Sequence, residues 1–175
     1  GWSDVEIVMD GGPKFQTYAN AIFYHAGVYL GLVAIFDTSD GPTDNKVWTE
    51  LAWSPDTIHW HRICKGTPFI PNSDVEGAPD WGTAYACLNP LFRDTDEVRI
   101  YYGGGDGKHN RYRDGYLMLA KMKKDRWAGY ENSGEVTIET VPVKCAGADL
   151  FVCADVESGG SVRAEVLGVD GLSAK

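Results

Sequence analysis

The chain has 175 residues, of which 43% are hydrophobic and 12% aromatic, and this composition excludes a disordered segment because such segments lack the apolar side chains that build a core. The formal net charge of −9 comes without a basic cluster of the size that phosphate backbones require, so we expect no nucleic acid partner. The longest apolar run, at 26–36, has eleven residues and cannot cross a bilayer of about 30 Å, so we expect no membrane partner.

Strand signals dominate the first part of the chain, and no helical apolar stripe of a dozen residues occurs. β-branched and aromatic residues gather in short segments that turn residues separate at 26–27, 39–42 and 55–56. These segments predict a four-stranded antiparallel meander over 15–64. Its strands are expected at 15–25, 28–36, 48–54 and 59–64.

The same order of segments recurs over 82–131. Tyr85 and Trp127 repeat Tyr18 and Trp60 at positions 67 residues later, which indicates an internal duplication. Four strands with a short first turn, a longer polar second loop and a Trp on the outer strand are typical of a β-propeller blade. We therefore predict an all-β fold with two propeller blades. The strands of the second blade are expected at 82–93, 97–103, 115–121 and 126–130.

A small polar linker at 132–134 ends the propeller region, which we place at 1–131. Further short strands and Gly-containing turns follow, and they predict the beginning of a β-sandwich over 135–175. The strands are expected at 135–144, 150–154 and 161–167, with turns at 146–148, 158–160 and 170–171.

Two blades cannot close a ring, because propellers typically use about four to eight. The expected partner is therefore the set of remaining blades of a longer chain, with self-association of several copies as the alternative. The sequence leaves the cellular compartment open.

Cysteines stand at 64, 87, 145 and 153, without a C-x-x-C motif or the Cys/His spacing of zinc sites. The apparent hairpin between Cys145 and Cys153 puts these two out of register for a disulfide. We interpret all four as reduced thiols, and we expect neither a metal nor a cofactor.

Four short motifs carry a resemblance to a known family. Residues 54–60 are similar to an S-x-D-G-x-x-W turn, and Pro-Phe-Ile-Pro follows at 68–71. Asp80-Trp81-Gly82 precedes an inner strand, and 100–104 ends the next one. On these motifs the chain resembles the five-bladed propeller glycosidases of glycoside hydrolase families 32 and 43. The resemblance implies the last two blades, the start of the trailing sandwich, and an oligosaccharide or polysaccharide bound in the propeller funnel.

The resemblance also has departures. The chain lacks the first-blade Asp of these families, and Tyr18-Ala19-Asn20 stands where family 32 has its Glu-Cys motif. Three hypotheses follow: a glycoside hydrolase, a non-catalytic carbohydrate-binding propeller, and a protein-interaction scaffold.

Glycoside hydrolysis needs two carboxylates on either side of the scissile bond. Our catalytic candidates are Asp80, Asp106 and Asp37, since blade topology places their loops on one rim of the channel. Asp37 and Asp106 share one repeat position, where the alternative interpretation is a turn cap. Glu50 lies inside a strand, and we expect it on a solvated face, with a partly buried acid as the alternative.

Aromatic rings stack on the apolar faces of sugars, and a polar loop at 107–114 could bind hydroxyls or a carboxylate. The alternatives are packing between blades for the aromatic residues and a solvated charge run for the loop. The candidate substrate-binding residues are Tyr18, Asn20, Trp81, Tyr85, His109 and Arg111.

Overall fold

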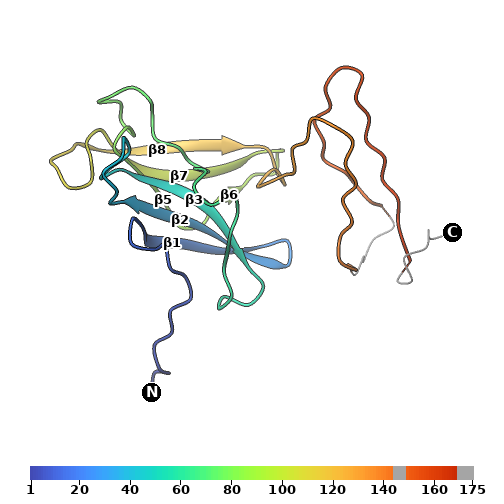
Figure 1. The fold of residues 1–175 in the computed structure, drawn as a ribbon, viewed down its shortest axis with the longest axis horizontal. Coiled ribbons are helices and arrows are strands. Elements are labelled where there is room, and N and C mark those ends of the chain that lie inside the picture. The colour runs from blue at the N-terminus through green and yellow to red at the C-terminus, as the bar shows by residue number, and fades with distance from the viewer. Residues whose placement is uncertain (144–148, 169–175) are drawn as a thin grey trace. The chain divides into compact units, whose positions relative to one another are not determined.

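The computed structural model describes residues 1–143 and 149–168, and the chain divides into two compact units, Gly1–Trp127 and Ala128–Lys175. The described residues contain strands and no helix, which confirms the all-β prediction, and none of them forms a helix that could span a membrane. The strands, shown in Figure 1, are β1 (Phe15–His25), β2 (Val28–Asp37), β3 (Val47–Ser54), β4 (His61–Arg62), β5 (Thr83–Ala86), β6 (Leu91–Phe92), β7 (Val98–Gly105) and β8 (Gly115–Met122).

The first meander, β1 to β4, pairs antiparallel in chain order, as predicted. The turn between β1 and β2 consists of Ala26 and Gly27, whose φ angles of 49° and 86° are both positive. Positive φ at both central residues defines the two-residue turn whose twist matches a hairpin, so this turn fixes the register of the longest strand pair.

The second meander is built around β7, which pairs with β8 along one edge and with β5 and then β6 along the other. The strand predicted at 82–93 is thus interrupted, because Asn89 has a φ of 62° and Pro90 has no N–H to donate. The strand predicted at 126–130 does not form. Trp127 instead packs its ring against Phe23 at 5.3 Å between centroids.

A parallel pair, Val47 with Thr83, joins the two meanders into one eight-stranded mixed sheet. The antiparallel pairing predicted inside the first repeat, β1 to β4, is confirmed. In the second repeat the order of β5, β7 and β8 is confirmed as well. The arrangement of these meanders as blades of a propeller stays a prediction.

The apolar residues of the first unit form two clusters. One cluster joins the meanders: Leu32 and Leu51 of the first and Ile100 of the second belong to it and are at most 3% exposed. The other covers the opposite face of the first meander, where Trp60 packs against residues such as Val33. Both faces of the first meander are therefore covered, as a sheet in the middle of a protein requires.

Glu50 corrects one expectation from the sequence. Its side chain is fully buried, because β3 lies between β2 and β4 and has both faces covered. Oε1 accepts hydrogen bonds from the Trp48 indole at 3.0 Å and from the Gly66 amide at 3.2 Å. Oε2 accepts two bonds from the guanidinium of Arg62, whose side chain is 8% exposed. A buried ion pair, in which both carboxylate oxygens of Glu50 accept hydrogen bonds, thus replaces the expected solvated acid.

The second unit is described for 128–143 and 149–168, and these residues form no strand. The strands expected at 135–144, 150–154 and 161–167 are therefore not formed among them, since nearly every side chain there is exposed and no core orders the backbone. The turn expected at 158–160 is present, with the Gly160 amide donating to the Glu157 carbonyl at 2.9 Å. The sandwich stays a prediction.

Cys64, Cys87 and Cys153 are free thiols, as expected. Cys145 and the turns expected at 146–148 and 170–171 lie outside the described residues.

Candidate functional site

Three loops meet at one end of the sheet, as the repeat predicts. They are the β2–β3 loop, the segment that enters β5, and the β7–β8 loop. The His109 amide donates to the Asn45 carbonyl at 2.7 Å, which ties the first loop to the third. The Val47 amide donates to the Gly82 carbonyl at 3.0 Å, which ties the first to the second. Side chains from distant parts of the sequence therefore gather on a common rim.

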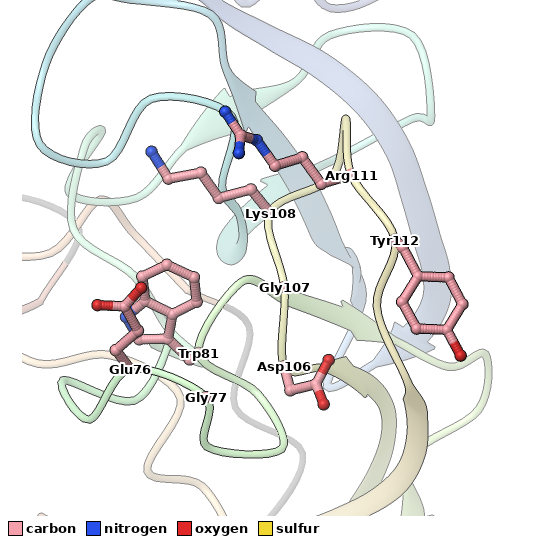
Figure 2. A pocket seen from close by; sticks show the side chains of 8 residues that line it. All are labelled: Glu76, Gly77, Trp81, Asp106, Gly107, Lys108, Arg111 and Tyr112. Atoms are coloured by element: carbon pink, nitrogen blue, oxygen red, sulfur yellow. The ribbon is translucent and has the colours of Figure 1, made fainter.

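Two of these loops, the segment that enters β5 and the β7–β8 loop, line an open hollow of about 440 Å³, shown in Figure 2. An indole ring, two carboxylates and two cationic side chains line it, together with backbone from two glycines. Three of the predicted site residues are among them. The complete set is Glu76, Gly77, Trp81, Asp106, Gly107, Lys108, Arg111 and Tyr112.

Lys46 supports the indole wall of this hollow. Its ammonium lies 4.2 Å from the centroid of the Trp81 ring, within the range of a cation–π interaction. Burial lowers the pKa of Lys46 from its ordinary value and the positive charge of Lys108 lowers it further, while the carboxylates of Asp74 and Glu76 act in the opposite direction. Lys46 supports the ring through its charge.

A second group of predicted residues forms a hydrogen-bonded cluster beside the hollow. The His109 imidazole lies between two phenols, with Nδ1 at 2.9 Å from the Tyr85 hydroxyl and Nε2 at 3.1 Å from the Tyr18 hydroxyl. The guanidinium of Arg113 also approaches Nδ1, at 3.4 Å. Because a guanidinium can only donate, Nδ1 is the acceptor of this imidazole and Nε2 carries the proton.

The cluster favours neutral forms of its side chains. Burial, and then the charge of Arg113, lowers the pKa of His109. Burial raises the pKa of Tyr85 to about 12. A neutral imidazole can donate to one phenol and accept from the other, which the protonated ring could not do.

Asp37 and Asp106 occupy equivalent places, and both cap their loops. The Asp37 side chain is fully buried and accepts bonds from the Ser39 amide at 2.7 Å and the Thr43 hydroxyl at 2.6 Å. Asp106 accepts the Asp114 amide at 2.8 Å but is only partly buried and lines the hollow. The turn-cap interpretation therefore holds for both, and of the two only Asp106 also faces a ligand space.

Asp80 and Asn20 lie apart from the hollow lining. Asp80 accepts a hydrogen bond from the Tyr102 hydroxyl at 2.8 Å, and burial together with this bond raises the pKa of Tyr102 to about 12. Asn20 lines a smaller hollow of about 240 Å³ that it shares with Tyr85. The predicted site residues therefore do not form one site. They are divided between the two hollows and the His109 cluster, and the remaining two, Asp37 and Asp80, accept hydrogen bonds from neighbouring residues.

Sequence reasoning did not single out Lys46, Lys108 or Tyr112. Lys108 and Tyr112 belong to the polar 107–114 loop, so their position next to His109 and Arg111 was the available signal. No sequence pattern points to Lys46, because its contact with Trp81 joins residues 35 positions apart.

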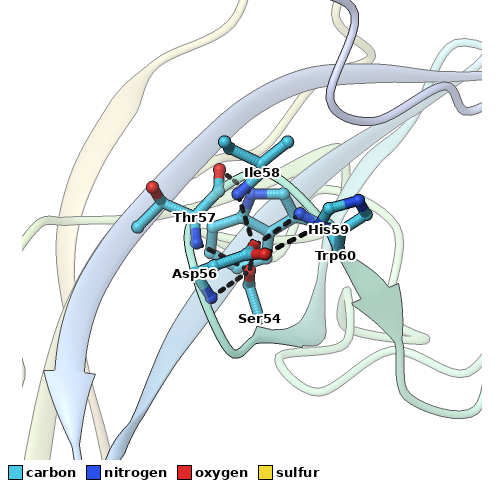
Figure 3. A network of polar contacts seen from close by, with 6 residues as sticks. All are labelled: Ser54, Asp56, Thr57, Ile58, His59 and Trp60. Carbon is cyan, nitrogen blue, oxygen red and sulfur yellow. Dashed lines mark hydrogen bonds and ion pairs between the residues drawn. The ribbon is translucent and has the colours of Figure 1, made fainter.

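The turn at residues 54–60, which carries part of the family resemblance, is closed by its own side chains (Figure 3). Ser54 Oγ accepts the amides of Asp56 and Thr57, at 3.2 and 2.8 Å. Asp56 Oδ1 accepts the amides of the second and third residues after it, and its bonds to His59 hold the pKa of this carboxyl well below its usual range. Thr57, which stands at the Gly position of the motif, has a φ of 72°.

No group of three His, Cys, Asp or Glu side chains in 1–143 and 149–168 is arranged to hold a metal ion.

No family model and no curated protein matches the chain. Among solved structures, the chain is similar to the protein of a BT0996 RGII complex, with a TM-score of 0.52 and 16% identity over 66% of this chain and 34% of that one. It is also similar to a glycosyl hydrolase from Bacteroides ovatus, with a TM-score of 0.41 and 18% identity over 61% of this chain and 29% of that one.

The first of these likenesses shows a shared fold with part of a larger protein. The chain spans about a third of the length of each of these structures.

Proposed function

We propose that the chain binds a saccharide in the hollow lined by Trp81, Glu76, Asp106, Lys108 and Arg111. The observation that carries this proposal is the combination of an indole ring with convergent charged groups at the end of the sheet where three loops meet. A ring of this kind packs against the C–H faces of a sugar, and charged side chains hydrogen-bond its hydroxyls. The volume of about 440 Å³ lies within the range of small-molecule sites.

The cluster of Tyr18, Tyr85 and His109 extends this surface. The Tyr18 side chain is about half exposed and lies 3.1 Å from His109, which belongs to the loop that also carries Arg111. A ligand longer than one sugar unit would reach the cluster from the hollow. The proposed ligand is therefore an oligosaccharide.

Titration of the chain with a panel of neutral and acidic oligosaccharides, followed by calorimetry and tryptophan fluorescence, tests the proposal. Trp81→Ala is expected to weaken binding at least tenfold, because it removes the apolar wall. Trp2→Ala is the matched control, since Trp2 is fully exposed on the N-terminal arm. Absence of binding to every saccharide, or equal binding by both variants, would overturn the proposal.

Hydrolysis of the bound saccharide is the second candidate, and one observation favours it. Glu76 and Asp106 line the same hollow, so two carboxylates could flank a glycosidic bond. Asp37 is buried and Asp80 is bonded to Tyr102, which leaves this pair as the candidate acid and base.

Release of reducing ends by the wild type and by Glu76→Gln and Asp106→Asn separates the two candidates. Loss of turnover with retained binding in the variants supports the hydrolase. A wild type that binds a saccharide and never cleaves it supports the non-catalytic carbohydrate-binding protein.

A further inference from the structure

The hollow is charged in an uneven way. Lys108 and Arg111 stand on the β7–β8 loop, and Figure 2 shows their side chains extending to the same side of the hollow. The carboxylate of Asp106 lies on the other side of the loop in this view, and Glu76 belongs with Trp81 to the segment that enters β5.

The cations of the hollow have no anionic partner among the residues that the structure describes. The ion pairs of those residues join other side chains and include neither Lys108 nor Arg111, and Lys46 contacts the Trp81 ring instead of a carboxylate. This is unusual in a chain with a formal net charge of −9, where acidic groups outnumber basic ones. A guanidinium and an ammonium without counter-ions on one wall of a hollow form a site that an anion fits.

Neither carboxylate of the hollow pairs with these cations, since no ion pair of the described residues joins Glu76 or Asp106 to Lys108 or Arg111. Asp106 already accepts the Asp114 amide at 2.8 Å through Oδ1, which occupies part of its capacity and directs it toward its own loop.

We infer that the hollow binds a saccharide that carries a carboxylate, as a uronic acid unit does, with the carboxylate on Lys108 and Arg111. This inference depends on the proposed function, of which it names the ligand class. The planar fork of Arg111 matches a carboxylate with two parallel hydrogen bonds, and Lys108 adds a point charge. Trp81 faces the sugar ring, and Glu76 and Asp106 accept hydrogen bonds from its hydroxyls.

Paired probes test the inference: oligogalacturonate and oligoglucuronate, each next to its neutral counterpart with the carboxyl groups reduced to alcohols. Calorimetric titration of the full chain is expected to give at least tenfold tighter binding of the acidic member, with an affinity that falls as salt is raised. Arg111→Gln and Lys108→Gln are each expected to weaken the acidic probe roughly tenfold and to leave the neutral one within about twofold.

Lys123→Gln is the matched control, since it removes the same charge from an exposed position after β8 and is expected to change neither affinity. Equal binding of acidic and neutral probes would overturn the inference and leave saccharide binding in place. Tighter binding of the acidic probe that Arg111→Gln and Lys108→Gln do not change would overturn the assigned site. Binding of inorganic phosphate as tight as that of the acidic saccharide would overturn the role of the sugar, and failure of every saccharide to bind would overturn the proposed function itself.

Discussion

Replacement of Glu50 by glutamine is expected to destabilise the first unit severely. Glutamine has the same shape and keeps an oxygen where Oε1 accepts the Trp48 indole and the Gly66 amide. It puts an NH₂ donor where Oε2 now meets two donors of Arg62. The guanidinium, 8% exposed, then has no counter-charge and faces another donor.

The magnitude follows from these contacts. Two charge-assisted hydrogen bonds are lost, and the isolated buried charge cannot reach water, so we expect a loss of about 3–5 kcal/mol in the free energy of unfolding. For a folded unit of this size the corresponding fall in Tm is roughly 10–20 °C. Replacing the cation as well, in Glu50→Gln with Arg62→Met, is expected to recover about 2 kcal/mol, because the uncompensated charge is then gone.

Urea unfolding followed by tryptophan fluorescence measures these differences. Glu97→Gln is the control, since it breaks ion pairs with Arg99 and Lys121 that are partly exposed to solvent, and it should leave the midpoint almost unchanged. A Glu50→Gln variant as stable as the Glu97→Gln variant, or a double variant less stable than Glu50→Gln alone, would refute the buried ion pair.

Three further predictions concern the turn, the Trp127 contact and the imidazole. Thr57→Gly is expected to raise the stability by about 1 kcal/mol in chemical unfolding, because glycine adopts the left-handed φ of 72° without strain, whereas Thr57→Ala should give no comparable gain. Trp127→Ala is expected to cost about 3 kcal/mol, since the ring packs on Phe23 and Phe69, and an effect no larger than that of Trp2→Ala would contradict this packing. The folded-state pKa of His109 lies below its unfolded value, so folding loses stability as pH falls below about 6.5. The Tm of the wild type should therefore drop more than that of His109→Gln between about pH 7.5 and 5.5, and parallel curves would contradict a lowered pKa.

Most strand positions could be predicted from the sequence, because interactions between residues close together in the chain decide them. The alternation and β-branched content of 15–25 and 28–36 fix β1 and β2, and the Ala26-Gly27 pair fixes the turn between them. The polar loops after β2 and β7 and the duplicated Asp at their start were visible as a repeat, so the convergence of these loops could be predicted.

Contacts between distant segments decided the rest. Glu50 looked solvated because a lone carboxylate is normally exposed, and only the return of β4 brings Arg62 over it. The strand expected at 126–130 does not form, and the Trp127 ring packs on Phe23, a contact between segments far apart in the sequence that no local pattern predicts.

The candidate site shows the same division. The sequence by itself determined that the described part of the chain is all-β and which polar loops share one end of the sheet. Only the tertiary structure decided that Trp81 and Arg111 line one hollow while Tyr18 and Tyr85 hold His109 beside it. The physical reason is that a loop's own residues set its turns, whereas the neighbours of a side chain depend on how strands far apart in the sequence pair.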